Sequence, residues 1–245
     1  MKYKYLKGPV KSRRLGKSLG IDVIPNNICS YNCVYCEVGL TDKLTTERKE
    51  YAPVDKIKKE IDHFLKQKPE INYLTFSSKG EPTLHSKISE IIQYIKQNHP
   101  KYKIALLTNS SLFNNESVIN EVTGVDLIIP SLDAVNEKTF LKLNRPHNTL
   151  DIKDIIDGLI KLRKTFKGEI WLEIFIVPGL NDNLQEIKSF SSVIDKIKPD
   201  LVQLNSLDRP APEEWVKPVP AKRLNSLAQE ISERINSNID VIAVN

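Results

Sequence analysis

The sequence predicts an α/β protein, a partial (β/α)6 TIM-like barrel with a C-terminal helix. Three observations support this: strand and helix patterns alternate along the chain, the connections between them are short, and there are six main strand patterns. Such alternation is typical of a parallel sheet or barrel. A chain of 245 residues, 40% of them hydrophobic, is long enough to bury the core of one such domain.

The elements follow in order along the chain. The first strand is expected at 19–25, where aliphatic and β-branched residues end at a proline, and the others at 73–77, 103–108, 127–131, 170–177 and 201–205. Apolar residues at helical spacing, such as Ile57, Ile61 and Leu65, predict helices at 54–68, 86–98, 116–123, 136–144, 152–166, 184–197 and 221–236. A short last strand is expected at 239–244.

Charge divides the chain into two parts, a basic N-terminal arm (1–18) and the barrel domain (19–245). The net charge is +5, yet seven cations precede the first acidic residue, Asp22: Lys2, Lys4, Lys7, Lys11, Arg13, Arg14 and Lys17. The rest of the chain therefore sums to −2. The arm is either a solvated tail or a surface that meets an anionic partner.

Composition also bears on the cellular compartment. The first 20 residues are basic throughout and lack the apolar centre of a signal peptide, and no apolar run reaches the roughly 20 residues of a membrane span. Three cysteines in one motif are not a disulfide framework. We therefore expect a cytoplasmic protein with no membrane contact.

All three cysteines lie in the segment CSYNCVYC, at Cys29, Cys33 and Cys36. Thiolates this close can turn to one point, which suits a metal ion or an iron–sulfur cluster. Clusters usually take four cysteines, so three would leave one iron with an exchangeable position. A zinc site of three cysteines and one histidine, or three unligated thiols, are the alternatives.

Polar clusters follow each of the six predicted strands. They lie at 29–36, 78–83, 108–110, 131–133, 178–182 and 205–209. In parallel β/α barrels, chemistry takes place where the strands end. We therefore expect these six segments to converge on one mouth.

The spacing C-x3-C-x2-C, with Tyr35 before the last cysteine, resembles the signature of the radical S-adenosylmethionine (SAM) superfamily. The resemblance implies that the three cysteines hold a [4Fe–4S] cluster whose fourth iron chelates the amino and carboxylate groups of SAM. Gly80-Glu81 resembles the GGE motif that binds the methionyl amino group, with Lys79 in place of its first glycine. By itself, Gly-Glu-Pro is an ordinary turn.

Further cofactor-binding residues are expected beside this motif. Ser78 lies in the same turn as Gly80, and Asn109 and Ser131 carry short polar side chains suited to a ribose or a carboxylate. Ser131-Leu132-Asp133 resembles a segment that contributes to SAM binding in several members of the superfamily. The alternative for Ser131 and Asp133 is that they cap the next helix.

Five other residues are weaker candidates. Arg145 and Arg209 each stand beside a proline in a loop and could clamp a carboxylate or phosphate. Glu173 interrupts an apolar strand, so its carboxylate either points into the mouth or pairs with a buried base. His85 and His147 lie near the predicted mouth.

Further motifs are similar to a group of radical SAM proteins related to the wyosine-forming tRNA synthases. They lie at 12–22, 80–84, 143–146 and 178–182, but no cysteine remains for the second cluster of the tRNA-modifying synthases. The resemblance implies reductive SAM cleavage to a 5′-deoxyadenosyl radical that takes a hydrogen from the substrate. An external one-electron donor, flavodoxin or ferredoxin, would reduce the cluster, and no catalytic side chain is assigned.

The substrate is left open by these motifs. Because the arm has few stacking aromatics and lacks a known RNA-binding motif, an anionic small molecule or peptide is favoured over tRNA. The rival functions are a wyosine-type tRNA-modifying enzyme, an activase that makes a glycyl radical on a partner, and a non-catalytic metal- or RNA-binding module.

Overall fold

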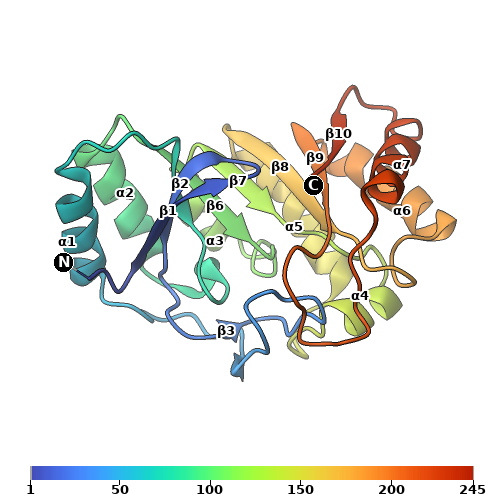
Figure 1. The fold of residues 1–245 in the computed structure, drawn as a ribbon, viewed down its shortest axis with the longest axis horizontal. Helices are drawn as coiled ribbons and strands as arrows, with labels where there is room; N and C mark the ends of the chain where they lie inside the picture. Colours follow the sequence, from blue (N-terminus) through green and yellow to red (C-terminus); the bar gives the residue numbers. More distant parts are fainter. Residues whose placement is uncertain (1, 245) are drawn as a thin grey trace.

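The computed structural model describes residues 2–244 and confirms the predicted α/β partial barrel (Figure 1). Eight strands form one sheet in the order β1-β2-β5-β6-β7-β8-β9-β10. From β2 onward neighbouring strands are parallel, and β1 pairs with β2 in antiparallel orientation. Because β1 and β10 are the two ends of this order, the barrel is open between them in the described part of the chain.

The main-sheet strands are β1 (Leu6–Ser12), β2 (Gly16–Ile21), β5 (Tyr73–Phe76), β6 (Lys103–Thr108), β7 (Leu127–Pro130), β8 (Glu169–Phe175), β9 (Leu201–Asn205) and β10 (Asp240–Ala243). A separate parallel pair consists of β3 (Ile28–Cys29) and β4 (Lys43–Leu44). The helices are α1 (Val54–Leu65), α2 (Ile88–Asn98), α3 (Glu116–Val122), α4 (Glu137–Leu143), α5 (Ile152–Thr165), α6 (Leu184–Ile197) and α7 (Ala221–Ser232), with a 3-10 turn η1 (Pro82–Leu84).

The first predicted strand, 19–25, is displaced toward the C-terminus of the observed strand β2 (Gly16–Ile21). The ladder to β5 runs from Ser18 to Ile21 and then stops. Beyond it, the backbone N–H groups of Val23 and Ile24 donate to the hydroxyl of Ser78 at 3.0 and 3.1 Å. After Ile21 the backbone therefore bonds to a side chain instead of to the neighbouring strand. The apolar pattern of the sequence does not reveal this change of partner.

Part of the basic N-terminal arm is a strand, since Leu6–Ser12 forms β1 at the edge of the sheet. The residues before it are held by helix α1. Buried Glu60 of α1 accepts hydrogen bonds from the backbone N–H groups of Lys4 at 2.9 Å and Tyr5 at 2.8 Å. Lys2, Lys4, Lys7, Lys11, Arg13 and Lys17 remain exposed.

Alternation along the strands separates two cores. On β6, Ile104 and Leu106 face the helices and belong to the main core, whereas Ala105 and Leu107 belong to a smaller cluster. The smaller cluster also contains Leu15, Tyr73, Leu127, Ile129 and Trp171. Because successive side chains of a strand point to opposite faces, this cluster fills the concave side of the sheet and forms an apolar floor below the strand ends.

Side-chain caps explain several helix boundaries. Asn115, Asn136, Asp151 and Asn183 accept hydrogen bonds from the first turns of α3, α4, α5 and α6. The cap of α4 is Asn136, so the helix-capping alternative for Ser131 and Asp133 is not what the structure has. None of the helices among residues 2–244 is both long and apolar enough to cross a membrane.

Candidate cluster and cofactor site

The three cysteines line one cavity of about 270 Å³ at the C-terminal ends of the strands. Cys29 ends β3 beside Leu44 of β4, and Cys33 and Cys36 follow in a turn where the N–H of Cys36 donates to the carbonyl of Cys33 at 3.2 Å. The loop is anchored to the C-terminal end of α4, because the N–H of Val34 donates to the carbonyl of Leu143 at 3.0 Å. The backbone therefore turns the three thiols toward a common space.

Five of the six predicted cofactor-binding residues line the same cavity: Ser78, Gly80, Glu81, Asn109 and Ser131. The sixth, Asp133, is not among its lining residues. The cavity is thus built from the segments after β2, β5, β6 and β7, as the strand-end argument predicts. The segments 178–182 and 205–209 do not line it, so the predicted convergence of six segments is only partly observed.

Two side-chain amides point at cysteine sulfurs. The Nδ2 of Asn109 donates to the Sγ of Cys29 at 3.4 Å, and the Nδ2 of Asn144 donates to the Sγ of Cys33 at 3.4 Å. N–H groups that donate to sulfur stabilise the thiolate form and tune the reduction potential of a bound cluster. This donor set, three soft sulfur ligands with amide support, fits an iron–sulfur cluster.

Burial dominates the acid–base state of the thiols. It raises the pKa of Cys29 to about 12, with the charge of Glu81 as the next cause. Burial also raises the pKa of Cys33 well above its usual value. Without metal, the thiols of Cys29 and Cys33 are therefore protonated at neutral pH, and metal binding there must release these protons.

Glu81 is buried, and its carboxylate is surrounded by donors. Oε1 accepts from the N–H of Thr83 at 3.0 Å and from the hydroxyls of Thr83 and Thr108 at 2.6 and 2.7 Å, while Oε2 accepts from the N–H of Asn109 at 2.7 Å. Because Asn109 in turn contacts Cys29, Glu81 connects the η1 turn and the end of β6 to the cysteine loop. Its predicted contact with the SAM ammonium stays a prediction.

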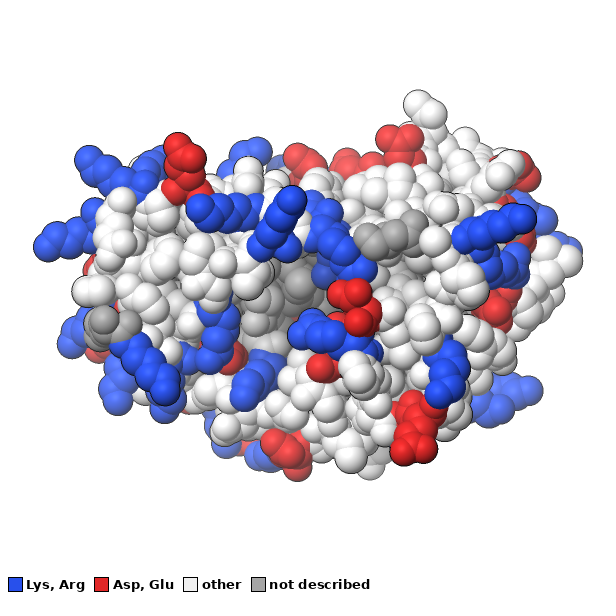
Figure 2. Space-filling model, in the orientation of Figure 1, with Lys and Arg blue, Asp and Glu red and all other residues white. Residues whose placement is uncertain are grey.

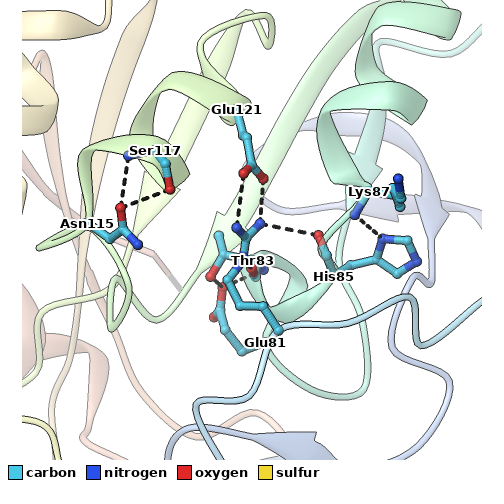
Figure 3. A network of polar contacts seen from close by, with 8 residues as sticks. Glu81, Thr83, His85, Lys87, Asn115, Ser117 and Glu121 are labelled. Carbon is cyan, nitrogen blue, oxygen red and sulfur yellow. Dashed lines mark hydrogen bonds and ion pairs between the residues drawn. The ribbon is translucent and has the colours of Figure 1, made fainter.

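The η1 turn is braced on its outer side by Arg48, which donates to the carbonyl of Thr83 at 2.9 Å and forms an ion pair with Glu121 of α3 (Figure 3). His85 belongs to this outer network. It is buried, its Nε2 lies 2.8 Å from the carbonyl oxygen of Ala52, and its Nδ1 accepts from the N–H of Lys87 at 3.2 Å. His85 is therefore a structural residue and does not line the cavity.

Gly80 permits a close approach, as its residue type suggests, but the approaching group belongs to the chain itself. A Cβ atom at Gly80 would lie 1.7 Å from the carbonyl oxygen of Ile28, the residue before Cys29. That carbonyl also accepts from the N–H of Glu81 at 3.2 Å. Gly80 thus lets the η1 turn pack directly against the backbone that carries the first cysteine.

We expect Gly80→Ala to lower stability and disturb cluster loading together. The added methyl group would overlap backbone atoms rather than a flexible side chain. The free energy of unfolding should therefore fall by at least about 1–3 kcal/mol, the range typical of overpacking. Denaturant unfolding and iron content measure the two effects. Gly20→Ala is the control, because its Cβ would meet the hydroxyl of Ser77 at 3.1 Å. Equal, small effects of both substitutions would contradict this prediction.

Asp133 lies behind the cysteine loop. Its carboxylate accepts from the hydroxyl of Tyr35, from the Nδ2 of Asn144 at 2.9 Å and from the N–H of Phe175 at 2.8 Å. The ring of Tyr35 stacks on that of Phe175, with centroids 3.9 Å apart. Asp133 therefore joins the cysteine loop to β8, and a direct contact with SAM stays a prediction.

The two arginines proposed as anion clamps are paired within the chain. Arg145 forms an ion pair with Glu213 at 2.5 Å. Arg209 contacts Glu37, the residue after Cys36, at 2.9 Å, and Glu37 also accepts from the N–H of Asp208 at 2.8 Å. The Glu37 contacts hold the proline-rich loop after β9 (residues 206–220) against the cysteine loop, and the Arg145–Glu213 pair holds it against the residues after α4.

Glu173 combines both roles considered for it. It lines the cavity, and its Oε2 forms an ion pair with the NH1 of Arg14 from the turn between β1 and β2. Sequence reasoning missed this partner, and it missed the amide of Asn144. In the sequence, these two residues are marked only by their positions. Asn144 stands beside Arg145, and Arg14 lies in the basic arm.

Several known proteins are similar to this chain in sequence or in fold. A family model described as the radical SAM superfamily matches residues 23–190. UPF0026 protein MJ1312 of Methanocaldococcus jannaschii is 38% identical over 233 residues, which cover 94% of this chain and 72% of that protein. A Brachyspira hyodysenteriae protein named GTPase Obg is 38% identical over 244 residues, but this chain spans 36% of its length.

Solved structures share the fold. TYW1 with a lysine–pyruvate adduct superposes with a TM-score of 0.66 at 17% identity, covering 89% of this chain and 74% of that one. Streptococcus suis SuiB bound to SAM gives 0.68 at 14% identity, covering 90% and 49%, and SuiB has also been solved with its precursor peptide SuiA. Because the family model spans well over half of the sequence, including all three cysteines, this chain belongs to the radical SAM superfamily.

Proposed function

We propose that the chain is a radical SAM enzyme that holds one [4Fe–4S] cluster on Cys29, Cys33 and Cys36 and binds SAM beside it. The observation that carries this proposal is the single cavity lined by all three cysteines together with Ser78, Gly80, Glu81, Asn109 and Ser131. When bound, the cluster and SAM supply reductive cleavage to methionine and a 5′-deoxyadenosyl radical, which takes a hydrogen atom from the substrate.

The protein's own part is to hold and shield these groups. Asn109 and Asn144 donate to two of the sulfurs and thereby favour their thiolate forms. Glu81 and Asp133 fix these amides, because Glu81 accepts from the backbone of Asn109 and Asp133 accepts from the side chain of Asn144. Leu107, a member of the apolar floor, also lines the cavity and adds an apolar group to its wall.

Anaerobic reconstitution with iron and sulfide tests the proposal. We expect brown protein with about four irons per chain, and formation of methionine and 5′-deoxyadenosine when SAM and a strong reductant are added. In cells a flavodoxin or ferredoxin would supply the electron. Colourless protein that binds zinc, or a reconstituted cluster that does not cleave SAM, would reject the proposal.

For the substrate we propose an anionic small molecule or peptide, in line with the exposed cations of the N-terminal segment. Lys and Arg side chains, with some acidic side chains beside them, border a hollow near the centre of the face drawn in Figure 2. Such a rim attracts anions and raises their rate of association. A peptide is within the range of the fold, since SuiB has been solved with its precursor peptide SuiA bound.

A wyosine-type role on tRNA is the second candidate, because the same cations would also contact phosphates. Removing residues 1–11 would delete most of β1 and expose β2, so substitution is the cleaner test. We expect the triple variant Lys7→Gln, Lys11→Gln, Lys17→Gln to change tRNA affinity little at 50 and 200 mM salt. Tight binding that falls steeply with salt and is lost in this variant would favour tRNA instead.

A further inference from the structure

A buried ion pair lies between two cavities of the barrel interior. Glu173 lines the cavity that holds the cysteines, whereas its partner Arg14 lines a lateral cavity of about 380 Å³ at the open side of the barrel. The lateral cavity is also bordered by Arg13, Trp171, Gln203 and residues of β10. The Arg14–Glu173 pair therefore forms part of the wall between the two spaces.

The surroundings of this pair are apolar along β8. Trp171 belongs to the apolar floor and Phe175 to the cluster behind the cysteine loop, and Glu173 lies between them on the same face. The side chains of Arg14 and Glu173 are 19% and 15% exposed. Burying two charges rarely adds net stability over an apolar pair, so their presence beside the cavity calls for a functional reason.

Gln203 supplies an independent observation. It is the register partner of Glu173 on the neighbouring parallel strand β9, so the two side chains point to the same face. Gln203 is 2% exposed, and its Oε1 has no hydrogen-bond partner among residues 2–244. Rotating the amide by 180° would only place an unpartnered nitrogen there. A buried amide in this state is a ready partner for a ligand.

The charges decide which ligand can enter. A ligand that opens the wall must separate Arg14 from Glu173, and an anion alone would leave the Glu173 carboxylate buried without a partner. A cation alone would do the same to Arg14. Either outcome is strongly unfavourable. A ligand with both charges satisfies both residues, its carboxylate against the guanidinium and its ammonium against the carboxylate.

We infer that Arg14, Glu173 and Gln203 form a substrate subsite that takes a dipolar amino acid group, with an ammonium and a carboxylate on one carbon. This inference rests on the proposed function, because a substrate subsite has a role only if the chain is an enzyme. Its position next to the cysteine cavity would bring the ligand's carbon skeleton toward the place where SAM is cleaved. Gln203 would supply a further hydrogen bond to the bound group.

Calorimetric titration of the reconstituted full chain tests the subsite. SAM is present at saturation, so that its own amino acid group does not compete, and the probes are the common L-amino acids except methionine. At least one should bind, and the matching amine and carboxylic acid, which each lack one charge, should bind at least about 100-fold more weakly. The double variant Arg14→Gln, Glu173→Gln leaves no unpaired charge, and its affinity should fall by the same factor. The control Lys153→Gln, at an exposed position of α5 that lines neither cavity, should bind normally.

Three results would overturn the inference: no amino acid binds, a one-charge analogue binds as well, or the double variant binds unchanged. In each case the ion pair would only hold the β1–β2 turn in place. Unfolding curves show whether the double variant is folded, and if it is not, the one-charge analogues still decide. SAM cleavage without any substrate is measured separately, so failure of the proposed function is distinguished from failure of the subsite.

Discussion

Replacing any one of Cys29, Cys33 and Cys36 with alanine is expected to remove most of the bound iron and all reductive cleavage of SAM. Under the proposed function each cysteine would supply one of three protein ligands, and the described residues around the cavity offer no other thiol. Two ligands do not hold a cluster that needs three. Iron content, the visible absorption of the cluster and chromatography of 5′-deoxyadenosine measure the loss.

The fold should survive these substitutions. The cysteines lie in a loop above the sheet, and each substitution removes only one small side-chain group. The raised pKa values of Cys29 and Cys33 mean that at these two positions the group removed is uncharged when no metal is bound. Leu40→Ala is the matched control, because Leu40 lies in the same loop and is 57% exposed. A triple cysteine variant that still bound four irons and cleaved SAM would refute the assignment.

Most of the barrel could be predicted from the sequence, because its strands and helices carry strong periodic patterns. The limits of β6 and β9 and of helix α6 agree with prediction to the residue. Strand β1 was not predicted, since its sequence, LKGPVKS, contains Gly8, Pro9 and two lysines and lacks alternation. It exists because β2 offers an edge and Glu60 holds the preceding backbone, and both are tertiary effects.

The candidate site was predictable at the level of segments but not of contacts. Polar residues at strand ends placed the cysteines, Gly80, Glu81, Asn109 and Ser131 in one cavity. A short polar side chain looks the same in a sequence whether it faces a ligand or a neighbouring loop. Asp133 faces the cysteine loop from behind, and Arg14 reaches Glu173 across 159 positions of the chain. Such pairs are formed by the closure of the barrel and leave no local pattern.

Glu81→Gln is expected to weaken SAM binding more than it lowers cluster content. If the carboxylate holds the SAM ammonium, losing its charge removes a charge-assisted hydrogen bond worth about 1.5–3 kcal/mol, or roughly 10- to 150-fold in affinity. Stability should fall as well. The four donors around the carboxylate would meet an amide nitrogen at one of its two positions, and a mismatched buried donor costs about 1–3 kcal/mol.

Glu121→Gln separates these two effects. Glu121 also accepts hydrogen bonds in the network that braces the η1 turn, through Arg48, but it lies on α3 and does not line the cavity (Figure 3). The substitution is chemically identical and should also loosen the turn, yet it leaves the cavity carboxylate in place. SAM affinity of the reconstituted protein, measured by equilibrium dialysis, should therefore fall in Glu81→Gln and not in Glu121→Gln. If both variants bind SAM as tightly as the unmodified protein does, Glu81 does not bind SAM and only holds the η1 turn and Asn109 in place.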